Sequence, residues 1–300
     1  MSSIAPNPDR HAQARLKRVV RRIYDIPSFP EVILRLAEVA DDPDSSSADL
    51  AAVMEKDQAL AAKILRLVNS AFYSLSRPVA SLHHAISLIG FNSVRALAIS
   101  VSVRSSFPTD GDPVGRMAFW EHSLFVACAT RTLGSRLRLP GGDDLFTAGL
   151  MHDLGVLVAR QHLPEEMQEA DRLVRECGAG AIQAERQVVG VEHPLLGAWL
   201  AEHWRLPPII HAAIRDHHDA LSPDWSERCA LDEESRRAVE LVALGDRLAQ
   251  AAGRPRIPDT PPVLERIPEH LIRLLDGADP DRLAAEILRQ AEGAREFITS

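Results

Sequence analysis

The chain carries an ordered series of histidine and aspartate residues of the kind that bind metal ions. Its seven members are His122, His152, Asp153, His193, His217, His218 and Asp246. Imidazole nitrogens and carboxylate oxygens together suit divalent first-row metals, and a pair of ions can hold the attacking and leaving oxygens of a phosphoester. If the seven side chains converge, we expect a mono- or dinuclear site for Fe, Mn, Zn or Ni. If they do not, the protein is a helical scaffold with scattered histidines.

The doublet His152-Asp153 is hard to explain as surface, because it lies between Leu150 and Leu154 on an apolar helical pattern. A buried carboxylate without a partner is costly, so Asp153 needs a cation or strong hydrogen-bond donors. Metal ligation and a buried polar network are the two alternatives. Gly155 follows the doublet, and its lack of a side chain permits the close approach of another backbone or of a ligand.

Three other members of the series each have a structural alternative. His122 lies in the middle of a predicted helix among apolar residues, and it is either a ligand or a hydrogen-bonded core histidine. His193 precedes Pro194 at a predicted helix start, where it is either a ligand or a capping and packing residue. Asp246 lies within a helical pattern and is either a ligand or an ordinary surface aspartate.

The pair His217-His218 can contact one site only under a geometric condition. Adjacent residues of a helix diverge by about 100°. A shared dinuclear site therefore requires the helix to end at this pair, which the following segment Asp219-Ala220-Leu221-Ser222-Pro223 permits.

Helical spacing dominates the chain that must position these residues. Apolar residues recur at that spacing within 32–39, 50–54, 60–68 and 94–101, and prolines fall between the runs. No convincing alternating strand pattern occurs, so the sequence predicts an all-α protein. A long helix is expected from about Met117 to Arg138, and the next begins near Asp143, whose carboxylate can cap it. Asn69 and Ser70 end another helix, where we expect them to cap the turn rather than to act in catalysis.

Composition and charge argue against several classes of protein. The chain has 300 residues, 46% of them hydrophobic and 25% charged, as in ordinary globular proteins. Its formal net charge of −8 speaks against a general nucleic-acid binder, so we expect no specific nucleic-acid binding. No Cys-x-x-Cys pair, signal-peptide core or stretch of transmembrane length occurs. We therefore expect a cytoplasmic protein without a transmembrane segment.

Seven short motifs follow one another along the chain. They read IPSFP at 26–30, KDQAL at 56–60, LVNSA at 67–71, AISLIG at 85–90, HPLLG at 193–197, WRLP at 204–207 and HH at 217–218. In this order they resemble the HDOD family, a set of bacterial output domains related to the HD phosphohydrolases. The resemblance implies a compact all-α fold and a regulatory role, in a family generally regarded as lacking the hydrolytic activity of true HD enzymes.

The seven metal-ligand-type residues separately resemble, in order, the ligands of the HD-GYP cyclic-dinucleotide phosphodiesterases. Three departures accompany this resemblance. Val156 stands where the His-Asp-x-Gly-Lys motif has its phosphate-contacting lysine, Gly-Tyr-Pro does not follow the histidine pair, and Ala118 replaces a glutamate one turn before His122. The resemblance therefore implies a metal site that has lost part of its contact with a substrate.

Three parts of the chain are expected. Residues 1–23 form a basic helical segment that contains Arg10, Arg15 and Arg22. Residues 24–110 form an N-terminal HDOD helical subdomain, and residues 111–300 form an HD-like helical subdomain with a C-terminal helical extension. The boundary falls in the loop at 105–115, which is rich in Pro, Gly, Asp and Ser.

These features favour a bacterial signalling protein that acts mainly as a binding or scaffolding module, with a retained metal site and no organic cofactor. Its partner would be a signalling protein or a small regulatory nucleotide. One alternative is a metal-dependent phosphohydrolase that acts on a cyclic dinucleotide or another phosphoester. A second alternative is a nucleotide receptor that binds without hydrolysis.

Overall fold

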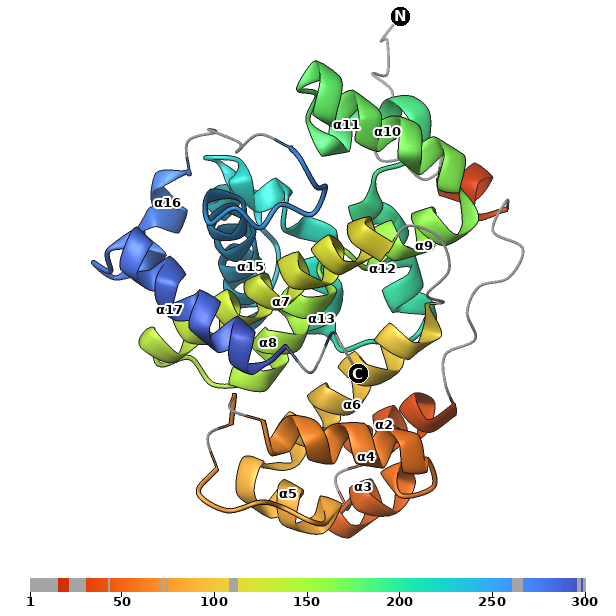
Figure 1. The fold of residues 1–300 in the computed structure, drawn as a ribbon, viewed down its shortest axis with the longest axis vertical. Coiled ribbons are helices and arrows are strands. Elements are labelled where there is room, and N and C mark those ends of the chain that lie inside the picture. Colours follow the sequence, from red (N-terminus) through yellow and green to blue (C-terminus); the bar gives the residue numbers. More distant parts are fainter. Residues whose placement is uncertain are drawn as a thin grey trace, which may run out of the picture.

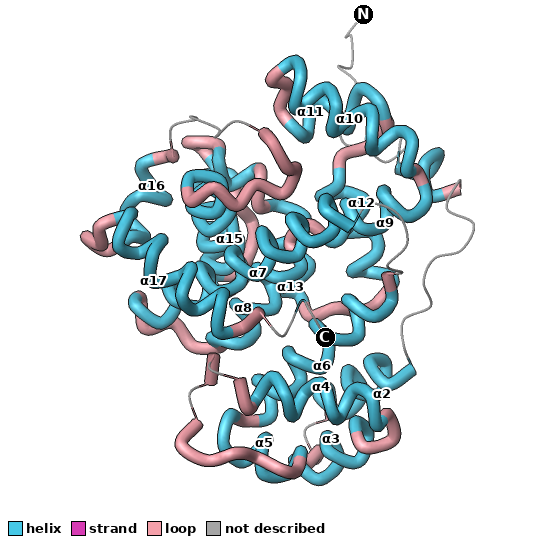
Figure 2. The backbone as a smooth tube through the Cα atoms, in the orientation of Figure 1, coloured by secondary structure: helices cyan, strands magenta, loops and turns pink. Residues whose placement is uncertain are grey.

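The computed structural model describes residues 16–21, 31–42, 44–70, 72–73, 75–107, 113–260, 267–295 and 298. Every regular element in these ranges is a helix, and Figure 2 draws no strand among them. The all-α prediction is therefore confirmed. Two predicted features lie outside the described residues, namely the motif at 26–30 and the arginines Arg10, Arg15 and Arg22 of the basic segment.

Four short helices form the orange group at the bottom of Figure 1. They are α2 (Glu31–Asp41), α3 (Ser47–Met54), α4 (Gln58–Val68) and α5 (Leu82–Ile89). All four pack against α6 (Phe91–Ser106), which packs in turn against α8 (Gly142–Met151) of the larger helical group. The predicted boundary lies between α6 and α7 (Pro113–Arg136), partly in residues outside the described ranges. The division into 1–23, 24–110 and 111–300 stays a prediction.

Side chains fix where the N-terminal helices begin. Ser46 and Asp49 form a capping box before α3, in which each side chain accepts a hydrogen bond from the backbone N–H of the other. The carboxylate of Asp57 caps α4 by accepting from the backbone N–H of Leu60 at 3.0 Å. Both caps satisfy N–H groups that a helix start leaves without partners.

Asn69 fixes the end of α4. Its Nδ2 donates to the carbonyl oxygens of Leu65 and Val79 at 2.9 and 2.8 Å, and its Oδ1 accepts from the Val79 backbone N–H at 2.6 Å. The Ser70 hydroxyl donates to the Leu67 carbonyl at 2.7 Å. These bonds tie the helix end to the segment before α5, so the structural role predicted for Asn69 and Ser70 is confirmed.

Helices α5 and α6 meet at a sharp turn on Gly90. The positive φ of +91° at this residue is a conformation that glycine adopts without steric cost, and the two helices are bent by 119°. In the described part of the chain, no single helix has the length and apolar composition to cross a membrane, and this bent pair meets that test only when its two helices are combined.

The larger helical group surrounds the crossing of α7 with α8 and α15, near the centre of Figure 1. Helix α12 packs against α9 and α13, α13 packs against α8 and α15, and α10 packs against α11. The remaining bounds are α9 (Leu154–His162), α10 (Pro164–Cys177), α11 (Ala181–Val188), α12 (His193–His203), α13 (Pro208–Asp216), η1 (Asp219–Leu221), α14 (Trp225–Arg228), α15 (Glu233–Ala251), α16 (Glu269–Ile272), η2 (Arg273–Leu275) and α17 (Pro280–Gly293).

Helix α8 begins in a different way from the one predicted. Gly141 adopts a left-handed conformation and serves as the N-cap, with no side-chain hydrogen bond. Asp143 lies inside the first turn, and its carboxylate accepts hydrogen bonds from the hydroxyls of Tyr73, at 3.3 Å, and of Ser93. The prediction that Asp143 caps α8 is therefore wrong, because its side chain binds Tyr73 and Ser93 instead.

Candidate metal centre

All seven metal-ligand-type side chains meet in one buried region. Their donor atoms fall into two groups, and within each group the atoms lie within 4.8 Å of one another. The first group is His122, His152 and Asp246, and the second is Asp153, His193, His217 and His218. The alternative of scattered histidines is thereby excluded on geometry.

Most of these residues come from helix ends. His152 directly follows α8 and Asp153 precedes α9, while His193 is the first residue of α12. The pair His217-His218 lies between α13 and η1, which meets the geometric condition for a shared site. Their ring centroids are 4.3 Å apart.

The other two residues are mid-helix. His122 belongs to α7 and Asp246 to α15, and these two helices pack directly against each other. Asp246 is only 5% exposed, so it is not an ordinary surface aspartate. Its Oδ1 lies 3.4 Å from His122 Nε2, and both of its oxygens accept from the Gln250 amide at 2.9 and 3.1 Å.

Asp153 joins the two groups. Its Oδ1 lies 2.9 Å from His193 Nε2 and 3.8 Å from His217 Nε2. Its Oδ2 lies 3.3 Å from His152 Nε2 and 3.9 Å from His122 Nε2. One oxygen of a buried carboxylate thus faces each group.

Four of the histidines are oriented by hydrogen bonds from Nδ1 to acceptors that are not among the seven residues. The acceptors are the carbonyl oxygens of Arg254, Gly149 and Ala213 for His122 (2.8 Å), His152 (2.7 Å) and His217 (3.0 Å), and the Glu185 carboxylate for His193 (2.7 Å). Each Nε2 is thereby turned toward Asp153 or its neighbours. Metal-binding histidines in proteins are oriented in this way.

The carboxylates of the site are ionised. Burial alone would raise the pKa of Asp153, but His152, Arg256 and His193 hold it well below its usual range. Burial acts in the same direction on Glu185, yet His193 and Arg256 lower the pKa of that carboxyl to about 2. The site therefore offers negative charge to a cation at neutral pH.

The histidines differ in the direction in which the site shifts their pKa. Burial, together with the neighbouring His152, lowers the pKa of His217 to about 3, and burial beside His217 holds the pKa of His218 well below its usual range. Burial would also lower the pKa of His193, but the carboxylates of Glu185 and Asp153 raise it to about 9. A proton and a metal ion would therefore compete for His193, whereas His217 and His218 are neutral.

Gly155 and Gly197 bring α9 against α12. A Cβ added at Gly155 would lie 2.0 Å from the His193 carbonyl oxygen and 2.6 Å from the Gly197 backbone nitrogen. Gly155 therefore permits the close approach of another backbone, which is one of its two predicted alternatives; the other was the approach of a ligand. This approach sets the position of His193 relative to Asp153.

Glu185 and Arg256 belong to the site but were not predicted from the sequence. The Glu185 carboxylate accepts from both Nδ1 and the backbone N–H of His193. Arg256 reaches Asp153 Oδ2 with Nε at 3.5 Å and Glu185 Oε1 with Nη2 at 3.2 Å. Glu185 lies at helical spacing between Ile182 and Val189, which was a detectable signal of a carboxylate on an apolar face. Arg256 lies in a Pro-rich loop without periodicity, where no such signal exists.

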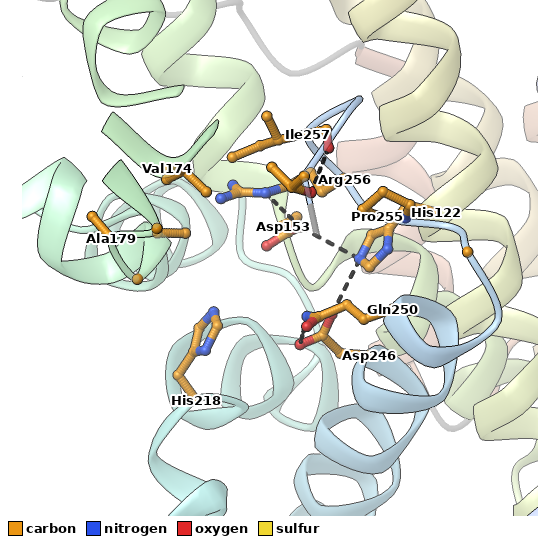
Figure 3. A pocket seen from close by; sticks show the side chains of 15 residues that line it. His122, Asp153, Val174, Ala179, His218, Asp246, Gln250, Pro255, Arg256 and Ile257 are labelled. Carbon is orange, nitrogen blue, oxygen red and sulfur yellow. Dashed lines mark hydrogen bonds and ion pairs between the residues drawn. The ribbon is translucent and has the colours of Figure 1, made fainter. Parts of the chain in front are cut away.

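A cavity of about 290 Å³ opens onto the two groups. One wall is the segment 178–181 between α10 and α11, and another is the loop 253–260 after α15. Figure 3 shows the Arg256 guanidinium extending from this loop over Asp153 toward Val174 and Ala179. His122, Asp246 and His218 complete the floor.

Besides the types of these residues, one further observation supports the fit of a metal ion. Nε2 of His217 is buried without a hydrogen-bond partner, and Nε2 of His193 pairs with the Asp153 carboxylate at 2.9 Å. Buried polar atoms are rarely left without partners in native proteins. The chemistry of the donor set, five imidazoles and two carboxylates, suits divalent transition metals.

The family model of the HDOD domain matches residues 26–220. The chain belongs to the HDOD family. This match spans the N-terminal helices and most of the larger group, and it includes six of the seven residues of the series, all except Asp246.

Solved structures share the fold of this HDOD chain. An HDOD domain protein of unknown function from Geobacter sulfurreducens is 25% identical, with a TM-score of 0.79 over 97% of this chain and all of the other. A protein from Shewanella amazonensis, provisionally assigned as a phosphohydrolase, is 23% identical with a TM-score of 0.71, over 96% of this chain and 99% of the other.

An uncharacterized protein of Treponema pallidum is 26% identical over 205 residues, which are 67% of this chain but only 39% of that relative. The chain thus spans about two fifths of its length.

Two departures from the HD-GYP pattern can be located in this HDOD chain. Val156 is fully buried in α9 and adds to the apolar core. Ala118 is half-buried in α7. Neither position can supply a charged group to the cavity.

Proposed function

We propose that this HDOD protein acts in bacterial signalling as a binding module built around a divalent metal centre. The residues that would hold the ions are His122, His152, Asp153 and Asp246 on one side and Asp153, His193, His217 and His218 on the other. The partner would be a signalling protein or a small regulatory nucleotide.

One observation carries the proposal. Nε2 of His217 is buried without a hydrogen-bond partner and lies 3.8 Å from the Asp153 oxygen that Nε2 of His193 contacts at 2.9 Å. A purely structural network would be expected to satisfy such an atom, because an unmatched polar atom costs about 1–3 kcal/mol. A cation among them would satisfy both nitrogens and the carboxylate together.

Binding is favoured over turnover by what the site lacks. When bound, divalent ions would supply Lewis-acid polarisation of a phosphoryl oxygen. The chain's own contribution to hydrolysis is reduced, because Val156 replaces a phosphate-contacting lysine and no Gly-Tyr-Pro follows the histidine pair. Electrostatic and positioning contacts of that kind are each worth on the order of 10²-fold in rate.

The alternative, a metal-dependent phosphohydrolase, is favoured by the position of Asp153. One of its oxygens faces each donor group, as required of a carboxylate that bridges two ions. A nucleotide receptor without turnover would use the same site. The phosphohydrolase and the nucleotide receptor would differ only in whether a hydrolysis product appears.

Metal analysis of protein purified without a polyhistidine tag tests the proposal. We expect about one or two equivalents of Fe, Mn, Zn or Ni, and loss of most of the metal in His152→Ala. His83→Ala, which removes an exposed histidine outside the series, is the matched control. Absence of metal after reconstitution with all four ions would contradict the proposal. Robust metal-dependent hydrolysis of a cyclic dinucleotide, lost in His152→Ala, would establish the enzyme instead.

A further inference from the structure

Arg256 is a buried cation with an unused donor. The residue is only 9% exposed, and its Nη1 is buried without a hydrogen-bond partner. Its other two nitrogens contact Asp153 and Glu185, which hold the guanidinium in place. Among the described residues that line the cavity, Arg256 is the one lysine or arginine. A planar guanidinium with an open donor is suited to a phosphoryl oxygen.

The N-terminus of α11 borders the same cavity. Ala181 begins this eight-residue helix, no side chain caps it, and residues 178–181 line the cavity wall that Arg256 faces. First-turn N–H groups of a helix lack partners within the helix, and the helix dipole favours negative charge at this end. The fixed guanidinium and the uncapped helix start are therefore two independent features that are both placed to bind one anion in this cavity.

Charge complementarity indicates how negative the ligand is. With neutral histidines as metal ligands, the three carboxylates Asp153, Asp246 and Glu185 and the one guanidinium of Arg256 leave the site with two net negative charges. Two divalent ions would reverse this to two net positive charges. A phosphomonoester dianion would neutralise the loaded site.

The cavity also limits the size of the ligand. Its volume of about 290 Å³ lies at the lower end of ligand sites, which usually occupy roughly 300–1,000 Å³. Apolar side chains of Val174, Pro255 and Ile257 line the remainder. This space suits a mononucleotide or a smaller phosphate ester better than a cyclic dinucleotide.

We propose that Arg256 and the N-terminus of α11 form a phosphoryl-binding subsite beside the metal centre, and that the ligand is a phosphomonoester of mononucleotide size or smaller. The inference rests on the proposed metal-dependent binding function and names its ligand class. Arg256 thus supplies the cation that the chain lacks at Val156.

Binding of inorganic phosphate and of AMP to the full-length protein tests the subsite, by calorimetry and by ³¹P NMR line broadening. Metal-loaded and chelator-treated samples are compared, and metal content is measured in each. Two variants are informative: Arg256→Gln removes the donor, and Ala181→Asp places a repelling carboxylate at a helix start that tolerates aspartate well. The second variant keeps the test valid if the first does not fold.

Matched controls are available for both variants. Arg172→Gln changes an arginine whose guanidinium contacts Glu169 and Glu176, each at 2.7 Å, and which does not line the cavity. Gln183→Asp makes the same charge change in the first turn of α11 at an exposed position.

We expect phosphate and AMP to bind the metal-loaded protein about 10- to 100-fold more weakly in Arg256→Gln and Ala181→Asp, as for the loss of a charge-assisted hydrogen bond. Metal content and both controls should be unchanged. Equal binding by wild type and the two variants at equal metal content would overturn the subsite. Tighter Arg256-dependent binding of a cyclic dinucleotide than of AMP would overturn the size assignment. Arg256-dependent phosphate binding by a chain that never takes up metal would support the subsite and contradict the metal-dependent function.

Discussion

The N-terminal helices and the helices around Asp153 both carry polar motif residues, but their polar atoms are satisfied differently. At the end of α4, Asn69 uses both of its amide atoms on backbone groups, and Ser70 donates to a carbonyl. Around Asp153, Nε2 of His217 and Nη1 of Arg256 are buried without hydrogen-bond partners. The motif residues at the end of α4 build the fold, whereas the residues around Asp153 leave donor atoms that a bound ion or ligand would satisfy. Each of the following predictions tests this contrast.

Gly155→Ala should have the largest effect. The added Cβ would lie 2.0 Å from the backbone oxygen of His193, which cannot rotate away as a side chain could. Overpacking costs about 1–3 kcal/mol or more, and we expect the upper end of this range together with loss of bound metal. Thermal melts and metal analysis measure both. Gly142→Ala, whose Cβ would meet nothing closer than Arg131 Cγ at 3.8 Å, should melt like wild type. A normal melting temperature for Gly155→Ala would show that α9 and α12 can separate freely.

Chelation should lower the melting temperature of the metal-loaded protein. The loss is about 2.7 kcal/mol when the free metal stands at 100 times its Kd. Asp153→Asn should melt lower than wild type and should respond little to chelator. Asp153→Ala should be less stable still, because it leaves Arg256 and His193 without a carboxylate partner.

The same set of melts distinguishes the alternatives for Asp153. No response to chelator, combined with a clear penalty for Asp153→Ala, would indicate a buried polar network without metal. Coincident curves for wild type, chelated wild type and both variants would contradict any role of Asp153 in the core.

The stability of the metal-free protein should fall as the pH rises from about 6.5 to 9. The folded pKa of His193 is raised to about 9 from 6.5, so its contribution is complete below 6.5 and is lost as the pH passes 9. The charged groups that face it are Glu185, Asp153 and Arg256. We expect an effect on the order of 3 kcal/mol. Glu185→Gln should flatten this profile, and an identical slope in that variant would exclude the His193–Glu185 pair as its origin.

Asn69→Ala should have the smallest of these effects and should leave the metal centre intact. It removes the acceptor of the Val79 N–H and two donors, at a cost of about 1–3 kcal/mol. Denaturant melts measure the loss, and metal content should stay at the wild-type value. Asn92→Ala, at an exposed position of α6, is the control. A loss of metal in Asn69→Ala would remove the distinction between the two regions.

The sequence predicted the all-α fold because helical spacing depends on local residue order alone. It also predicted the seven members of the series, since histidine and aspartate on apolar helical patterns are uncommon without partners. Whether they bind metal stays a prediction. Arg256 was missed because its role depends on where a loop folds back onto Asp153, which no local pattern encodes. Asp143 was misassigned for a related reason, because its partners Tyr73 and Ser93 lie about 50 or more positions earlier in the chain.

The two ends of α8 have a mechanical consequence. Its first turn carries Asp143, which is held by Tyr73, in the segment between α4 and α5, and by Ser93 of α6. Its last residue is followed directly by His152. A ten-residue helix is about 15 Å long and stiff along its axis. An axial shift of His152 would therefore be transmitted to Asp143 and to the hydroxyls that hold it. By thermodynamic reciprocity, a partner that moved the N-terminal helices along this axis would change the affinity at His152 by the same factor that a ligand at His152 changes the affinity for the partner.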